Sequence, residues 1–597
     1  MGSTRPVDGA EMAKEVIIKE ELIKKTCSLA MKDQKEPYLC NKSSLYPQPI
    51  FGDNNKSRVF CFSSSCSVDD WWSNRPFGET KVDSELFPSL KCIGLEEIAT
   101  VNQAFQERFK AILSNPNFKN EVGEAVRSKK QVIFTGHSSG GAVAILATIW
   151  FLEEYRRKEH LDVKPYCVTY GSPLVGDRII NHSLRREDWS CFFINVVNRY
   201  DIVPRVLLAP FSSTDKHLQQ VSNFFNQKSQ SKRVLPENAS DFYKSVIRNA
   251  SSVASHAACK LMGSTNALLE TVSSFVGLSP YRPIGTYVFC TGDRRPVMIS
   301  NSDAILQTLF YSCQLSVAGD LQEIARKSFN DHLKYKQDIL GSLQWESAIV
   351  LDHQRLGAIP LSSGTPYVES TTNEALDNLG LSEKARLCLR AAAEFEKQKY
   401  SNKTKINEKT GEIKSGIKEL EGYKKNCEAS GVCFYDAFRA SDNEADFHAN
   451  VTRLNLAGIW DEIVELLKRS ELPDEFEVLG DWVELGTSYR RITEPLDIAN
   501  YYRHLKNEDT GPYMAKGRPK RYKCTERWRD HDLRRPSELT GSCFWAQVEE
   551  LHGRTGSPGS REEITSLNEK LATWIQEKEL GEDVRFKNSS FMKLLES

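Results

Sequence analysis

The residues best suited to chemistry surround a serine at position 138. Residues 136–140 read Gly-His-Ser-Ser-Gly, after an apolar run from Val132 and before an apolar, helix-forming run to Thr148. Strand, tight turn and helix make up the nucleophile elbow of α/β-hydrolases, in which the turn raises the serine Oγ to the top of the sheet. A glycine on each side lets strand and helix approach closely, because a Cβ would clash there. We predict that Ser138 is an elbow nucleophile rather than part of an ordinary strand-to-helix turn.

An acid and a histidine further along the chain complete a candidate triad. Asp201 follows a buried strand over residues 191–197, and the triad acid of this fold lies at the carboxyl end of a strand that comes after the nucleophile. His332 is the best placed of the later histidines. Ser138 would attack an ester carbonyl, His332 would accept its proton, and Asp201 would orient the imidazole. The backbone N–H of Ser139 would stabilise the oxyanion.

The loop that should supply a second oxyanion donor is unusual. Residues 63–65 are three serines after a strand over 58–62, where lipases tend to carry a glycine-containing turn. The segment from 206 to 300 is also much longer than a simple lid. Both features favour a triad that is kept without turnover over a working hydrolase.

The pattern of elements around the serine indicates an α/β fold. Apolar strands at 59–62, 132–135, 166–170 and 191–197 alternate with helical stretches, which predicts a mainly parallel, doubly wound sheet. After about residue 365 the strand signals fade and helical patterns dominate, with a break near Thr410. We predict two domains: an α/β-hydrolase domain over 1–365 and an all-α helical bundle over 366–597.

Composition and charge exclude several classes of function. The 597 residues carry a formal net charge of −1, so the whole molecule has no field that would attract nucleic acid or an anionic membrane. No apolar run is long enough to span a membrane, and no signal peptide is expected. The 15 cysteines are scattered without metal-ligand spacing, which predicts reduced thiols, no metal site and a location in cytoplasm or nucleus.

A short apolar stripe lies in the long segment after Asp201. Its members fall at helical spacing: Leu268, Val272, Phe275 and Val276. Four apolar groups at i, i+4, i+7 and i+8 share one face of a helix. Periodicity alone favours packing of this helix on its own sheet; a partner interface is the alternative.

A basic and aromatic string lies between residues 494 and 523. Its cations are Arg503, His504, Lys506, Arg518, Lys520, Arg521 and Lys523, and its aromatic residues are Tyr501, Tyr502, Tyr513 and Tyr522. Cations with aromatic neighbours suit a phosphate and a stacked base. Charge alone favours a solvated face or a nuclear-localisation patch. Nucleic-acid binding through 516–535 is a weaker hypothesis, because the cluster is short and acidic residues surround it.

These motifs resemble known families. The elbow, the Tyr170–Asp177 strand end and the Asp201–Pro204 turn are similar to class-three lipases. Their particular forms, together with the string after Glu494, resemble the plant lipase-like immune-regulator family of Enhanced Disease Susceptibility, Phytoalexin Deficient and Senescence-Associated proteins. The resemblance covers essentially the whole chain, and it implies a lipase-like α/β-hydrolase domain followed by a helical "EP" domain. It also implies that His332 matches the triad histidine.

The resemblance implies a scaffold rather than an enzyme. The helix at Leu268–Val276 would insert into a groove on a homologous lipase-like partner and form a heterodimer. A cavity lined by both EP domains would receive a ribosylated adenine nucleotide, and the occupied dimer would recruit helper NLR immune receptors. Positions that match the family's ligand or signalling residues are Phe447, His504, Lys506 and Arg521. No resident cofactor is implied, and the alternative function is a serine lipid acyl hydrolase that uses Ser138, Asp201 and His332.

Overall fold

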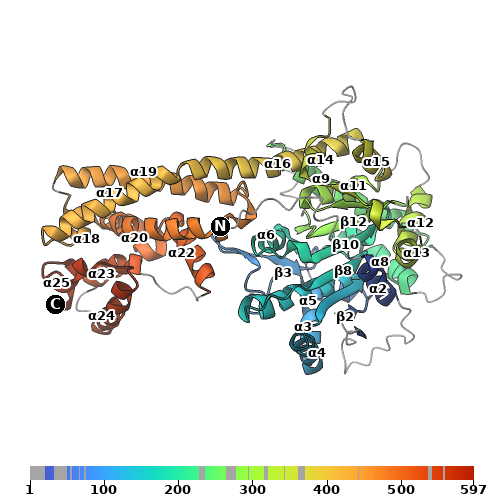
Figure 1. Cartoon of the computed structure of the whole chain (residues 1–597), viewed down its shortest axis with the longest axis horizontal. Coiled ribbons are helices and arrows are strands. Elements are labelled where there is room, and N and C mark those ends of the chain that lie inside the picture. Colours follow the sequence, from blue (N-terminus) through green and yellow to red (C-terminus); the bar gives the residue numbers. More distant parts are fainter. Residues whose placement is uncertain are drawn as a thin grey trace. The chain divides into compact units, whose positions relative to one another are not determined.

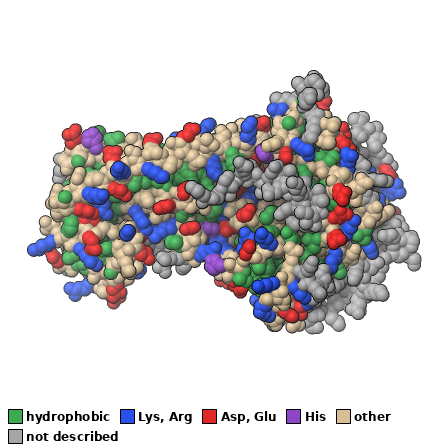
Figure 2. Space-filling model, viewed as in Figure 1, with side chains coloured by type: hydrophobic (Ala, Val, Ile, Leu, Met, Phe, Trp, Pro, Cys, Tyr) green, Lys and Arg blue, Asp and Glu red, His purple; other side chains and the backbone are tan. Residues whose placement is uncertain are grey.

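The computed structural model describes residues 20–31, 50–53, 57–65, 67–72, 75–226, 235–263, 277–292, 295–314, 321–341, 343–360, 370–441, 443–534, 541–554 and 559–596. It divides into two compact units, which we describe separately. The first comprises Met1–Cys92 and Glu97–Lys397, and the second comprises Ile93–Glu96 and Gln398–Ser597. Acidic and basic side chains are interspersed on the visible face, as a net charge near zero predicts (Figure 2).

An eight-stranded sheet forms the centre of the first unit (Figure 1). Its strands, in spatial order, are β1 (Ile50–Asp53), β2 (Ser57–Phe62), β7 (Gln131–His137), β8 (Tyr166–Tyr170), β10 (Phe193–Asn198), β12 (Thr286–Cys290), β13 (Val297–Ile299) and β14 (Ile349–Leu351). The pairs from β2 to β12 are parallel, as is β13 with β14, whereas β1 and β13 run antiparallel to β2 and β12. The four predicted strands are the adjacent β2, β7, β8 and β10, which confirms the α/β-hydrolase prediction.

Smaller strands and helices surround this sheet. A second sheet has the order β11 (Tyr281–Arg282), β9 (Gly176–Asp177), β6 (Thr100–Asn102), β3 (Glu79–Lys81), and β4 (Lys91–Cys92) pairs with β5 (Glu97–Ile98). The helices are α2 (Glu20–Ala30), α3 (Gln103–Leu113), α4 (Pro116–Arg127), α5 (Ser139–Phe151), α6 (Arg178–Arg186), α7 (Val203–Val206), α8 (Phe211–Asn226), α9 (Ala239–Leu261), α11 (Ser302–Tyr311), α12 (Leu321–Asp331), α13 (Tyr335–Gly341), α14 (His353–Gly357) and α15 (Ser370–Asn378).

Helix α5 is buried along its whole length, because nearly all of its residues are apolar or small. It starts against β7 at very short range. A Cβ at Gly136 would lie 2.3 Å from the carbonyl carbon of Gly140, and a Cβ at Gly140 would lie 2.3 Å from the carbonyl oxygen of Phe62. The two glycines therefore permit the close approach that the elbow requires.

The first unit extends beyond the predicted boundary at residue 365. Helix α15 and the first part of α16 (Glu383–Glu408) belong to it. Arg199 donates to the carbonyl of Asn378 at 2.8 Å, and Arg390 donates to the carbonyl of Ile359 at 2.7 Å. These contacts tie the start of the helical region to the α/β unit, which ends at Lys397.

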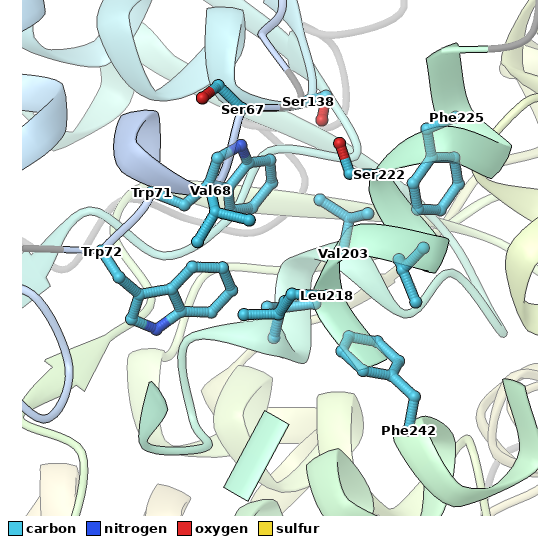
Figure 3. A pocket seen from close by; sticks show the side chains of 12 residues that line it. Ser67, Val68, Trp71, Trp72, Ser138, Val203, Leu218, Ser222, Phe225 and Phe242 are labelled. Atoms are coloured by element: carbon cyan, nitrogen blue, oxygen red, sulfur yellow. The ribbon is translucent and has the colours of Figure 1, made fainter. Parts of the chain in front are cut away.

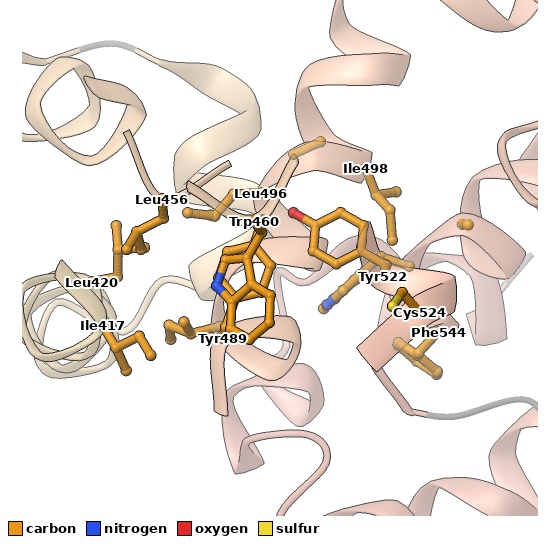
Figure 4. Packing of buried hydrophobic residues seen from close by; sticks show 14 of the residues in the cluster. Ile417, Leu420, Leu456, Trp460, Tyr489, Leu496, Ile498, Tyr522, Cys524 and Phe544 are labelled. Carbon is orange, nitrogen blue, oxygen red and sulfur yellow. The ribbon is translucent and has the colours of Figure 1, made fainter. Parts of the chain in front are cut away.

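The described part of the second unit is helical, as predicted. After the end of α16 it contains α17 (Thr410–Ala429), α18 (Phe434–Ala440), α19 (Glu444–Lys468), α20 (Gly480–Arg503), α21 (Lys506–Thr510), α22 (Lys520–Leu533), α23 (Phe544–His552), α24 (Ser560–Gln576) and α25 (Ser590–Glu596). Its core holds stacked rings (Figure 4): Trp460 lies 5.0 Å from Tyr489, which lies 5.5 Å from Tyr522. No helix among the described residues is both long and apolar enough to cross a membrane.

Four residues from early in the chain complete the second unit. The fully buried carboxylate of Glu477 accepts the backbone N–H of Gly94 at 2.7 Å and that of Ile93 at 3.3 Å. A Cβ at Gly94 would lie 2.5 Å from the sulfur of Cys524 on α22. The segment Ile93–Glu96 is therefore built into the helical core, although it is distant in sequence.

Candidate functional site

Ser138 occupies a sharp turn between β7 and α5. Its φ of 56° and ψ of −133° lie outside the regions that non-glycine residues usually adopt. Its backbone N–H donates to the carbonyl of Tyr170 at 2.9 Å, and its own carbonyl accepts from Gly141 at 2.9 Å. These bonds and the close packing of β7 on α5 hold a conformation that would otherwise be unfavourable. This is the elbow geometry that the sequence predicts.

Asp201 and His332 meet as the sequence predicts. The Nδ1 of His332 lies 2.9 Å from Oδ2 of Asp201, and both side chains are buried. Asp201 also accepts the hydroxyl of Tyr335 at 2.6 Å and the backbone N–H of Val203 at 2.8 Å. Because Nδ1 faces the carboxylate, that nitrogen carries the proton and Nε2 is left as the basic atom. An imidazole held in this way can act as a general base. Among the described residues no hydrogen bond joins its ring to the hydroxyl of Ser138. The catalytic role of the three residues therefore stays a prediction.

The histidine before the serine positions the triad histidine. The rings of His137 and His332 stack with centroids 4.3 Å apart, and Nε2 of His137 lies 2.9 Å from the carbonyl oxygen of His332. Burial, reinforced by the neighbouring His332, lowers the pKa of His137 to about 3. The ring is therefore neutral at physiological pH, and its Nε2–H donates to the carbonyl. The sequence places His137 in the elbow motif but gives no sign of this contact.

A buried arginine braces the three-serine loop. The hydroxyl of Ser139 accepts the backbone N–H of Ser65 at 2.8 Å and donates to the carbonyl of Ser65 at 3.0 Å. Arg108 on α3 donates to this hydroxyl at 3.3 Å and to the hydroxyl and carbonyl of Ser63. The sequence analysis missed Arg108. The sequence feature that could have revealed it is a cation on an otherwise apolar helix face, between Phe105 and Ile112.

Ser138 lines a small apolar cavity (Figure 3). The cavity has a volume of about 50 Å³, room for a few water molecules at roughly 10–15 Å³ each. Helix α8 supplies one wall, and the lining residues are Ser67, Val68, Trp71, Trp72, Ser138, Val203, Val206, Leu218, Val221, Ser222, Phe225 and Phe242. The ring of Phe225 lies 4.9 Å from that of His332. With Ser138 only 4% exposed, the described residues leave little room for an acyl substrate.

The four residues expected to face a ligand lie on different helices of the second unit. Phe447 on α19 is 63% exposed, and His504 and Lys506, at the end of α20 and the start of α21, are also exposed. Arg521 on α22 is instead largely buried between Asp461 and Asp497. No hydrogen bond or ion pair joins these four residues to one another in the part of the chain that the structure describes. Three of them are therefore available at the surface and one is already engaged.

Much of the basic and aromatic string serves the helical core, contrary to expectation. Tyr501, Tyr513 and Tyr522 are buried and pack among one another and their neighbours, so they cannot stack on a base. Arg518 forms buried ion pairs with Glu494 and Glu526. Burial of the Arg518 guanidinium is tolerated because its charge is paired with these two carboxylates.

The predicted partner helix cannot be placed. Leu268, Val272, Phe275 and Val276 lie within residues 264–276, outside the described residues. Helix α9, which precedes them, ends at Leu261.

Comparisons with known proteins match both units. The class 3 lipase family model matches residues 59–211, and the model of the Enhanced disease susceptibility 1 protein EP domain matches residues 418–597. Protein EDS1L of Arabidopsis thaliana is 41% identical over 579 residues, which cover 90% of this chain and 90% of that protein. Lipase-like PAD4 of the same plant is 24% identical, covering 78% of this chain and 74% of that protein. Senescence-associated carboxylesterase 101 is 23% identical, covering 80% and 71%.

His137 should make stability depend on pH. Its pKa of about 3 in the folded state compares with roughly 6.5 in an unfolded chain. Between these values the unfolded state binds more protons, so stability falls as the pH falls, by at most about 1.4 kcal/mol per pH unit. We expect His137→Asn to reduce this dependence, measured as the free energy of unfolding in urea from about pH 7.5 to 4.5.

The test compares how the free energy of unfolding changes with pH in His137→Asn and in wild type. Burial raises the pKa of Glu153 to about 7 and that of Asp331 to about 6. These carboxyls bind more protons when folded, so they oppose the contribution of His137 in wild type and variant alike. His448→Asn, at an exposed histidine, is the control. Equal slopes in wild type and His137→Asn would contradict the prediction.

Proposed function

The chain belongs to the Enhanced disease susceptibility 1 family of plant immune regulators, and from this premise we propose that it is a signalling scaffold rather than a hydrolase. The observation that carries the proposal is 41% identity to a family member across 90% of both chains, which includes both units. The scaffold would promote basal and receptor-triggered disease resistance. It would act in the cytoplasm and the nucleus without a resident cofactor.

The lipase-like unit would provide the partner interface. Lipase-like PAD4 and Senescence-associated carboxylesterase 101 are relatives of this chain along most of its length. We propose a heterodimer with a protein of this kind, seeded by Leu268, Val272, Phe275 and Val276. Burial of four such side chains would contribute roughly 1.5–3 kcal/mol each before the cost of ordering. This gain would offset much of the cost of association.

The helical unit would provide the ligand site. Lys506 is an exposed cation that could meet a phosphate, His504 is an exposed hydrogen-bonding ring beside it, and Phe447 offers an exposed aromatic ring. We propose that these residues and Arg521 face a ribosylated adenine nucleotide in a cavity completed by the partner. The occupied heterodimer would then recruit helper NLR immune receptors.

A serine lipid acyl hydrolase is the second candidate function. The elbow conformation of Ser138 and the hydrogen bond between His332 and Asp201 favour it. The small cavity and the low exposure of Ser138 favour the scaffold. In the scaffold the same three residues would contribute to stability alone.

Removal of the triad should leave signalling intact. We expect a Ser138→Ala, Asp201→Ala, His332→Ala variant to retain immune-signalling output in a plant cell-death assay, because a scaffold does not need to hydrolyse an ester. Protein level and partner binding are measured alongside, since Asp201 and His332 are buried. Wild type should also resist labelling by a fluorophosphonate, with Ser138→Ala as the labelling control. Lost signalling in a folded, partner-bound triple variant would favour the hydrolase.

Charge on the apolar stripe should prevent partner binding. We expect Leu268→Glu with Phe275→Glu to abolish co-purification with the lipase-like partner, because two carboxylates would have to be buried. Thr271→Glu with Ser273→Glu adds the same charge to the same segment at polar positions and should bind normally. Undiminished binding of the first variant would exclude this stripe as the interface.

Arg521 should matter for signalling but not for dimer formation. We expect Arg521→Ala to bind the partner normally and to lose nucleotide-dependent receptor recruitment, scored by co-precipitation. Arg554→Ala removes the same charge from an exposed pair in the same unit and is the control. Normal recruitment by Arg521→Ala would remove this residue from the proposed site.

A further inference from the structure

Arg521 lies in a row of charges that crosses three helices of the second unit. From Nη2 it donates to Asp497 on α20, and from Nη1 it donates to both carboxylate oxygens of Asp461 on α19, at 3.2 and 2.9 Å. Asp497 also accepts the hydroxyl of Tyr522 at 2.7 Å and a hydrogen bond from Arg453. The Arg521 guanidinium therefore has one carboxylate on each side.

The two carboxylates differ in how firmly they are held. Asp497 is 7% exposed and accepts hydrogen bonds from three side chains. Asp461 is 54% exposed, and its carboxylate pairs with Arg521. Solvent and salt weaken an exposed ion pair, whereas the loss of one partner from a buried pair is strongly unfavourable. Asp461 is thus the exchangeable partner and Asp497 the fixed one.

The terminal nitrogens of Arg521 bind different carboxylates. Nη2 donates to Asp497 and Nη1 donates to Asp461. A guanidinium is a planar fork of donors whose geometry matches carboxylate and phosphate oxygens. A phosphate oxygen could therefore take the position at Nη1 that the Asp461 carboxylate holds.

Arg453 provides a second guanidinium beside the fixed carboxylate. It pairs with Asp497, as Arg521 does. If Asp461 moved away, Arg453 and Arg521 would share the single carboxylate of Asp497. That arrangement would favour another anion in the place that Asp461 had left.

We propose that Asp461 competes with an anionic ligand for Arg521. Its carboxylate occupies Nη1 when the site is empty and moves into solvent when a phosphate of the ligand binds there. The inference rests on the proposed function, in which that ligand is a ribosylated adenine nucleotide. Asp461 thereby raises the nucleotide concentration needed to fill the site. It would also limit receptor recruitment when no nucleotide is bound.

Nucleotide affinity tests this competition. The full chain in complex with its lipase-like partner is titrated with ADP-ribose by calorimetry. Asp461→Asn keeps the shape of the side chain and removes its charge, so we expect about two- to fivefold tighter binding. Arg521→Lys added to Asp461→Asn should abolish the gain, because an ammonium group lacks the forked donors. Unchanged or weaker binding by Asp461→Asn would overturn the proposal.

A neighbouring residue provides a matched control. Glu462 is the next residue on α19, is 50% exposed and pairs with Lys409 rather than Arg521. Glu462→Gln removes the same charge, and we expect its affinity for ADP-ribose to equal that of wild type. Equal tightening in both variants would mean that net charge alone is responsible, and the specific competition would be rejected.

A second probe separates the competition from the proposed function. Inorganic phosphate is added to the full chain without partner, at constant ionic strength, and the Tm is followed. Asp461→Asn should gain more from phosphate than wild type or Glu462→Gln. If ADP-ribose binds no variant while phosphate selectively stabilises Asp461→Asn, the nucleotide function fails and the competition stands. If ADP-ribose binds wild type but neither probe distinguishes Asp461→Asn, the competition fails.

Discussion

The lipase-like unit depends on a backbone-to-backbone approach between β7 and α5. At Gly136 and Gly140 a single methyl group would lie 2.3 Å from a backbone atom. These positions therefore fix the distance between the central strand and its helix, and Ser138 between them must adopt a φ of 56°. The three-serine loop bonded to Ser139 and the imidazole stacked on His137 take their places from this contact.

Buried hydrogen bonds explain how a triad can persist without turnover. Asp201 accepts from His332, Tyr335 and Val203 in a site closed to solvent. Loss of one partner would leave a buried polar group unsatisfied, at a cost of about 1–3 kcal/mol. Arg108 has the same role for the three-serine loop. Asp201 and His332 would therefore contribute to the stability of the fold whether or not they react with a substrate.

Local patterns in the sequence predict the helices and strands well. The functional sites are harder to predict, because they depend on contacts between segments that are distant in the chain. The strands and the elbow can be recognised from short runs of neighbouring residues, such as 132–140. Asp201 and His332 could be paired because the fold dictates their order along the chain. The brace from Arg108 depends on how α3 packs, which no local pattern encodes. The tyrosines at 501, 513 and 522 were misread for the same reason: the sequence shows their polarity, while tertiary packing decides their burial.

The segment Ile93–Glu96 limits how the helical unit can be inherited or exchanged. Because Glu477 receives its amide partners from this tetrapeptide, the unit is discontinuous in sequence. A recombination event with one crossover near residue 398 would pair a helical bundle with a foreign tetrapeptide, and Cys524 leaves no space for a side chain at position 94. A helical unit moved to another protein would therefore need the segment Ile93–Glu96 as well as the chain from Gln398 onward.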